Sequence, residues 1–73
     1  MTLEAIKNAG SQVAQAAIQS AIENGATNPR DEAFDTLDGV GPWGMGDICG
    51  ADLPACDDDD LEAIHAAAVA VLS

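Results

Sequence analysis

The stretch ACDDDDLEAIH, residues 55–65, holds the residue types most suited to chemistry in this chain. Four consecutive aspartates, Asp57–Asp60, precede Glu62 and the single histidine, His65. Glu62 and His65 form a Glu-x-x-His step, and carboxylate-bridged metal bundles use two such steps together with two further glutamates. A lone face of Asp58, Glu62 and His65 could hold a metal ion. The simpler interpretation is a partly exposed histidine that pairs with Glu62 or with another nearby acid.

A calcium loop of the EF-hand type is not predicted. Such a loop needs oxygen ligands at positions 1, 3 and 5, a glycine at position 6 and a glutamate at position 12. The pattern fails when it is counted from Asp31, Asp35, Asp47, Asp52 or Asp57. Weak and loosely organised binding of a divalent cation remains open.

Nucleophilic and phosphate chemistry have little support. The three serines lie in no recognisable nucleophile setting, and nothing local indicates that Cys49 or Cys56 is reactive. No GK[ST] or GxGxxG motif follows a predicted strand. Acyl carrier proteins are also small, acidic and helical, but they need an Asp-Ser-Leu step where this chain has aspartate. The sequence therefore predicts a protein that is not an enzyme and needs no cofactor.

The negative charge lies in one part of the chain. The whole chain carries 13 acids and two Lys or Arg residues, which gives a formal net charge of −11. Residues 1–30 hold two acids and two bases and sum to zero, residues 31–62 hold eleven acids and no base, and residues 63–73 hold no charged side chain. Such asymmetry indicates an interaction surface that repels nucleic acid and membranes and attracts basic proteins.

The sequence predicts a cytoplasmic protein. The first 25 residues contain glutamines and asparagines where a secretory signal needs an apolar run, and no stretch is long and apolar enough to span a bilayer. Cys49 and Cys56 would then be reduced. Their C-x6-C spacing favours ordinary thiols over a disulfide or a zinc site.

With 73 residues, the chain is expected to form a single acidic helical domain over 1–73. Residues 2–23 are predicted to be a long helix that ends at Asn24-Gly25. Gly10 falls within the apolar arc of this helix, which would be explained by another helix packing closely there. The arc consists of Leu3, Ile6, Val13, Ala14, Ala17, Ile18, Ala21 and Ile22.

A second, short helix is predicted within NPRDEAFDTLDG, with Asn28 as its cap, Pro29 at its first position and Gly39 at its end. The spacing of Asp31, Asp35 and Asp38 places them on one stripe of this helix. The opposite face is expected to enter the core through Ala33, Phe34 and Leu37.

The glycine- and proline-rich segment that follows is expected to hold a short helical turn near Trp43–Cys49, started by Pro42 and flanked by loops. Trp43 and Met45 either fill the core or form an exposed anchor for a partner. The last helix is predicted from about Asp59 to Leu72, with Asp59 as N-cap and Glu62 at its third position. Its buried stripe would be Leu61, Ile64, Ala68 and Leu72. The expected fold is therefore an all-α bundle of three helices plus a short turn.

Capping does not account for every acid, so the acids are predicted to form a partner-binding surface. The predicted members are Asp31, Glu32, Asp35, Asp38, Asp47, Asp52, Asp57, Asp58, Asp59, Asp60 and Glu62. DNA carries closely spaced phosphates, and a rigid protein with rows of carboxylates can occupy a basic groove that normally holds DNA.

In size and charge, and in its clusters DEAFDTLD and CDDDDLE, the chain resembles the small acidic phage-encoded anti-CRISPR proteins of the DNA-mimic type. The resemblance implies binding to the basic, PAM-reading channel of a CRISPR surveillance complex in the host bacterial cytoplasm. No family residue can be carried over position by position.

Two other functions remain open, and the chain could act as a monomer or a homodimer. A helical adaptor or dimerising regulator would use apolar contacts through Trp43, Met45 and Ile48, and its partner binding would be insensitive to salt. A halophile protein would use its acids for solubility in high salt. However, halophile acids usually spread over the whole surface, whereas residues 1–30 are neutral overall.

Overall fold

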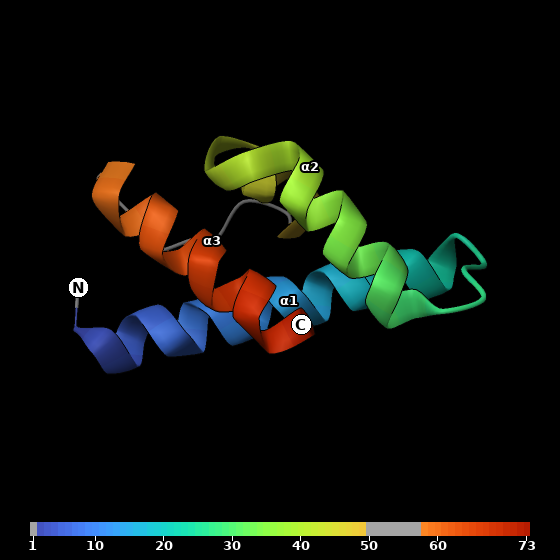
Figure 1. Ribbon diagram of the computed structural model, residues 1–73, viewed down its shortest axis with the longest axis horizontal. Helices are drawn as coiled ribbons and strands as arrows, with labels where there is room; N and C mark the ends of the chain where they lie inside the picture. The colour runs from blue at the N-terminus through green and yellow to red at the C-terminus, as the bar shows by residue number, and fades with distance from the viewer. Residues whose placement is uncertain (1, 50–57) are drawn as a thin grey trace.

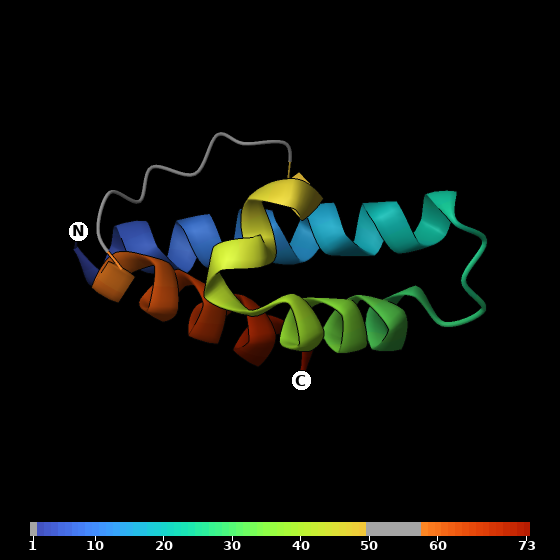
Figure 2. The same ribbon diagram turned by 90° about the horizontal axis from the view of Figure 1, so that it is seen from above.

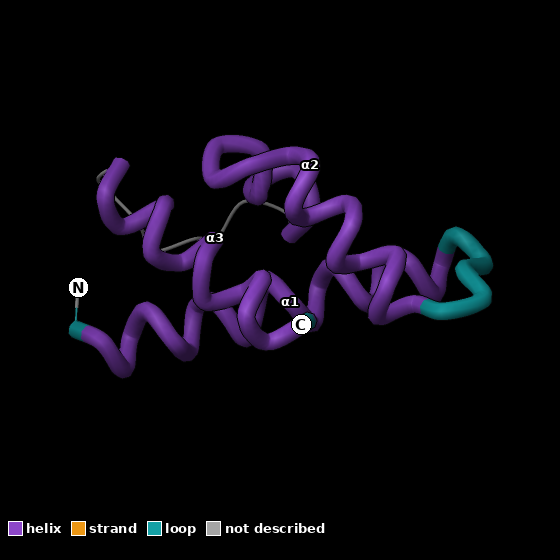
Figure 3. Tube along the Cα trace, viewed as in Figure 1, coloured by secondary structure: helices purple, strands orange, loops and turns teal. Residues whose placement is uncertain are grey.

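The computed structural model describes residues 2–49 and 58–73, with residues 46–49 described by their backbone alone. This part of the chain forms three helices, α1 (Leu3–Glu23), α2 (Pro29–Cys49) and α3 (Asp58–Leu72), and contains no strand. Helix and one short loop account for nearly all of it (Figure 3). Helices α2 and α3 lie on the same side of α1 (Figures 1 and 2). The predicted all-α bundle is confirmed.

Helix α1 has well-defined signals at both ends. Thr2 is its N-cap, and the Thr2 hydroxyl oxygen accepts a hydrogen bond of 3.1 Å from the amide of Ala5. At the other end, Gly25 has a φ of 78°, and the amides of Gly25 and Ala26 donate to the carbonyls of Ile22 and Ala21. These two bonds form a Schellman motif, in which glycine adopts the left-handed conformation without a steric penalty. The predicted stop at Asn24-Gly25 is confirmed.

Helix α2 consists of two helical segments that meet at Gly41. Gly41 has φ 74° and ψ −179°, a conformation available essentially to glycine alone. Pro42 follows and begins the second segment, because proline lacks the amide that would continue the first. The predicted start at Pro42 is correct. The predicted end at Gly39 and the loop after it are wrong, because the first segment continues through Val40.

The core between the three helices is built from small side chains. Five of its ten buried members are alanines, so the helices approach one another closely. The ten are Ala9, Val13, Ala14, Ala17, Ala33, Leu37, Met45, Ile64, Ala68 and Leu72. Phe34 and Leu61 are half-buried and pack against this cluster. Leu3 and Ile22, which were expected in the core, are exposed.

Helices α1 and α3 make a close contact at Gly10. A Cβ atom on Gly10 would lie 2.7 Å from the Cβ of Ala67 and 3.0 Å from the backbone nitrogen of Ala68. At these distances no side chain fits at position 10. The backbone of α1 therefore packs directly against the methyl group of Ala67 on α3. The close packing predicted at Gly10 is confirmed.

The antiparallel pair of α2 and α3 is held by two bases that bind carbonyls of the opposite helix. The guanidinium of Arg30, in the first turn of α2, donates to the carbonyls at the end of α3: Val71 at 2.8 Å, Leu72 at 3.3 Å and Ser73 at 3.4 Å. The Nε2–H group of His65 donates to the carbonyl oxygen of Leu37 at 2.8 Å. A carbonyl can only accept, so this contact fixes the proton on Nε2.

Both contacts satisfy helix ends. The last four carbonyls of a helix have no partner within it, and the last turn of α3 contains no basic residue of its own. Arg30 therefore supplies from α2 the positive charge that the C-terminal end of α3 lacks. His65 has a similar role at the end of the first segment of α2. It donates a hydrogen bond to the carbonyl of Leu37, which is one of the last four carbonyls before Gly41.

We predict opposite effects of two glycine-to-alanine changes. G10A should lower the free energy of unfolding by up to about 2 kcal/mol, because overpacking (~1–3 kcal/mol) exceeds the gain in helix propensity (~1 kcal/mol). G39A is the matched control, because a Cβ on Gly39 meets no atom within 4 Å. G39A should therefore raise stability. Urea unfolding followed by circular dichroism measures both, and a stabilising G10A would contradict the close contact.

Two substitutions of Arg30 should show how much of its effect on stability comes from its charge and how much from its forked hydrogen-bonding geometry. R30M removes every bond to the end of α3 and should cost about 1–2 kcal/mol, a value lowered from that of buried charged hydrogen bonds because Arg30 is exposed. R30K keeps the charge but lacks the planar fork that donates from both Nε and Nη2, so it should lie between R30M and the wild type. Urea midpoints of the three proteins provide the measurement. Equal stability of R30M and wild type would contradict the capping role.

Candidate functional site: the acidic surface of α2 and α3

The structure describes the side chains of eight of the eleven acids predicted to bind a partner. They are Asp31, Glu32, Asp35, Asp38, Asp58, Asp59, Asp60 and Glu62, and they are called the acidic surface below. All are exposed except Asp60, which is half-buried. Asp47 lies in α2 with its side chain outside the described residues, and Asp52 and Asp57 also lie outside them.

The fold itself accounts for five of these eight acids. Asp31 and Glu32 lie in the first turn of α2, and Asp58–Asp60 lie in the first turn of α3. A carboxylate in the first turn is stabilised by the helix dipole by about 0.3–1 kcal/mol. Asp31 also accepts a hydrogen bond of 2.8 Å from the side-chain amide of Asn28. These five positions would be acidic in many helical proteins without any partner.

The prediction that Asp59 caps the last helix is wrong. Helix α3 begins at Asp58, so Asp59 lies inside its first turn and is not its cap. The pattern allowed either start because each aspartate of the run can cap equally well. Asp58, Asp59 and Asp60 therefore share one favourable electrostatic position.

The fold does not account for Asp35, Asp38 and Glu62. Asp38 lies in the last turn before the break at Gly41, where a carboxylate opposes the negative end of the helix dipole. Asp35 is one turn earlier on the same stripe and repels Asp38. Glu62 lies beyond the first turn of α3 and is exposed. These three acids are the best candidates for selection by something outside the chain.

The antiparallel pairing places the acids in succession along α2 and α3. His65 contacts Leu37, so Asp38 lies level with the middle of α3. From there Asp31 is about 10 Å away along α2, and Asp58 is about 10 Å away along α3 in the opposite direction, at 1.5 Å per residue. The acidic surface therefore extends over about 20 Å of the helix pair.

None of the three basic side chains neutralises this surface. Arg30 and His65 donate to backbone carbonyls, as described above. Lys7 lies on α1 and forms no hydrogen bond or ion pair with any residue that the structure describes. The expected pairing of His65 with Glu62 is wrong, because His65 reaches across to Leu37 instead. Nothing in the sequence reveals that contact, which joins residues 28 positions apart.

Trp43 and Met45 have different positions, although the sequence allowed the same position for both. Met45 is fully buried in the core, whereas Trp43 is 62% exposed at the beginning of the second segment of α2. The indole Nε1–H of Trp43 donates to Asp58 Oδ1 at 3.4 Å, a long hydrogen bond. The ring is thereby held beside the acids that begin α3, with Val40 also exposed nearby in the sequence.

The described residues contain neither a metal-binding cluster nor a membrane-spanning helix. No three His, Cys, Asp or Glu side chains come together there as a metal-binding group. None of the three helices, as far as they are described, has an apolar stretch sufficient to cross a bilayer.

The dipole argument predicts opposite effects of two aspartate-to-asparagine changes in α2. D38N should raise the free energy of unfolding by about 0.3–1 kcal/mol, because it removes a charge from the wrong end of a helical segment and from beside Asp35. D31N should lower stability, because it removes a favourable charge and leaves only a neutral acceptor for the hydrogen bond from Asn28. Both effects should shrink in about 1 M salt, where screening acts within ~3 Å. Urea unfolding at two salt concentrations tests this, and a destabilising D38N would show that Asp38 has a structural role.

Comparison with known proteins leaves the chain without an assigned family. No protein-family model, no curated protein and no solved structure matches it.

Proposed function

We propose that the chain is a non-enzymatic inhibitor whose acidic surface occupies the DNA-binding groove of a basic protein. The observation that carries the proposal is the position of Asp35, Asp38 and Glu62. They are exposed, they lie on two adjacent helices, and the fold gains nothing from them. A destabilising charge that gains no internal partner is best explained by an external one.

The density of charge supports a DNA-like surface. B-DNA presents one negative charge per about 1.7 Å of helix axis when both strands are counted. About 20 Å of the helix pair would correspond to about six base pairs and about twelve phosphates. Eight described carboxylates lie along this length. The acidic surface therefore carries about two thirds of the charge of the DNA segment that it would replace.

The resemblance to DNA-mimic anti-CRISPR proteins suggests which basic protein is bound. We propose the channel of a CRISPR surveillance complex that reads the PAM, which would place the encounter in a bacterial cytoplasm. Lysine and arginine side chains in such a channel would pair with the carboxylates. Binding of this kind is steered by charge and weakens as ionic strength rises.

Two pairs of substitutions test whether position or total charge matters. D35N/E62Q and E4Q/E23Q each remove two negative charges, but only the first pair lies on the acidic surface; Glu4 and Glu23 are on α1. Immobilised wild type and E4Q/E23Q should retain the same bacterial protein at about 50 mM salt, and duplex DNA should release it. D35N/E62Q should bind it at least about tenfold more weakly, a difference of ~1.4 kcal/mol.

The retained protein should then be purified, and its DNA binding should be measured by gel shift with increasing amounts of the chain. Loss of the shift supports the inhibitor. Equal weakening by both double variants would show that net charge alone matters. Retention that duplex DNA cannot reverse would contradict competition for a DNA groove.

A second candidate function is favoured by the exposure of Trp43. A large exposed aromatic is a common anchor of protein interfaces, and its loss often costs more than 2 kcal/mol of binding free energy. In a helical adaptor, W43A should abolish partner binding, and about 0.5 M salt should leave the binding of the wild type unchanged. In the DNA mimic, salt should release the partner and W43A should have the smaller effect. Trp43 is exposed, so circular dichroism should show the fold of W43A intact.

A further inference from the structure

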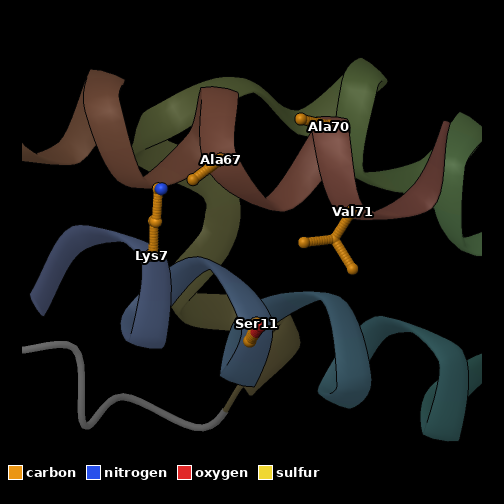
Figure 4. A pocket seen from close by; sticks show the side chains of 5 residues that line it. All are labelled: Lys7, Ser11, Ala67, Ala70 and Val71. Atoms are coloured by element: carbon orange, nitrogen blue, oxygen red, sulfur yellow. The ribbon is translucent and has the colours of Figure 1, made fainter. Parts of the chain in front are cut away.

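A groove between α1 and α3 lies away from the residues that form the acidic surface. It has a volume of about 390 Å³ and is lined by Lys7 and Ser11 from α1 and by Ala67, Ala70 and Val71 from α3. Figure 4 shows the side chains of Lys7 and Val71 directed from opposite helices into the space between them. Most of the lining is apolar, with the Lys7 ammonium group at one side.

The charge around this groove differs from that of the rest of the molecule. Helix α1 holds two acids and one base and residues 63–73 hold no charged side chain, so the side chains of α1 and the second half of α3 carry a net charge of −1, against −11 for the whole chain. Two copies of a chain with net charge −11 repel each other over most approaches. The groove lies where this repulsion is weakest.

The first turns of α1 present groups that complement the groove. Leu3 is 69% exposed, the most exposed of the large apolar side chains in the described residues. Glu4 and Lys7 are spaced i, i+3 and Leu3 and Lys7 are spaced i, i+4, so the three lie together on the helix surface. One short stretch thus holds an apolar side chain, an acid and a base that has no described partner.

We infer that a second copy of this chain occupies the groove. With two α1 helices antiparallel about a two-fold axis, Leu3 of each copy enters the groove of the other, against Val71 and the alanines of α3. Glu4 of each copy then pairs with Lys7 of the other. A two-fold contact needs such self-complementarity, because each copy uses the same surface.

A second copy fits the groove better than a small amphiphilic anion does. Such a ligand could use Lys7 and the methyl groups, but it would leave Leu3 in water. The second copy covers Leu3 and Val71 together, and both are exposed in the single chain. A chain of 73 residues with a small, alanine-rich core buries little apolar surface on its own, so association that buries more would stabilise it.

Analytical ultracentrifugation of the purified chain tests the inference, at about 0.15 M salt to screen the long-range repulsion. The wild type should sediment as a concentration-dependent dimer. E4K should place a lysine opposite Lys7 of the other copy, and the repulsion should make the chain monomeric. K7E should place a glutamate opposite Glu4 of the other copy and have the same effect. The double variant E4K/K7E restores opposite charges across the two-fold axis and should dimerise again. L3A should weaken association at least about tenfold.

Helix content measured by circular dichroism confirms that each variant is folded, as expected for exposed positions. D35N/E62Q serves as the control on the acidic surface and should dimerise like the wild type. A monomeric wild type would overturn the inference, as would a dimer that E4K leaves intact or an E4K/K7E variant that stays monomeric. The assay contains no DNA-binding protein, so its outcome is independent of the proposed inhibition.

Discussion

The arrangement of α2 against α3 depends on how the chain uses its few positive groups. Arg30 lies at the carbonyl end of α3, and His65 donates to a carbonyl near the end of the first segment of α2. Each helix therefore stabilises an end of the other, and this fixes their antiparallel alignment. Neither base forms an ion pair with a described carboxylate. The acidity of the surface follows from composition, because residues 31–62 hold eleven acids and no Lys or Arg.

The acids separate into two groups when each is compared with its position in a helix. Those in first turns lower the free energy of the folded chain and need no further explanation. Asp38 does the reverse, since it lies where the helix dipole is unfavourable and beside another aspartate. A halophile protein would explain acids anywhere on the surface, but only two of the thirteen acids, Glu4 and Glu23, lie on α1. Glu23 in the last turn of α1 also opposes a helix dipole, but Asp35, Asp38 and Glu62 lie on two adjacent helices, which agrees better with one binding surface.

The sequence was sufficient for features that depend on neighbouring residues. The helices, the stop at Asn24-Gly25 and the close packing at Gly10 follow from periodicity and glycine chemistry. Features that depend on distant residues were missed or wrong. The partner of His65 is 28 residues away, and the exposure of Trp43 depends on the turn that Gly41 makes possible. Gly39 and Gly41 both suit a helix end, and only the position of Pro42 after Gly41 determines which one ends the segment.

The two surfaces of the molecule follow from this same division of charge. Helix α1 carries little net charge, with two acids and one base, and packs against α3 through Gly10, which leaves Lys7 beside the apolar edge of α3. Helices α2 and α3 carry the uncompensated acids. A contact through α1 would leave these acids exposed on each copy, so association and binding to a basic partner do not compete for the same residues. Two copies joined in this way would present two acidic surfaces. A partner with an extended basic groove would bind the dimer more tightly than a single chain only if both acidic surfaces contact the groove at the same time.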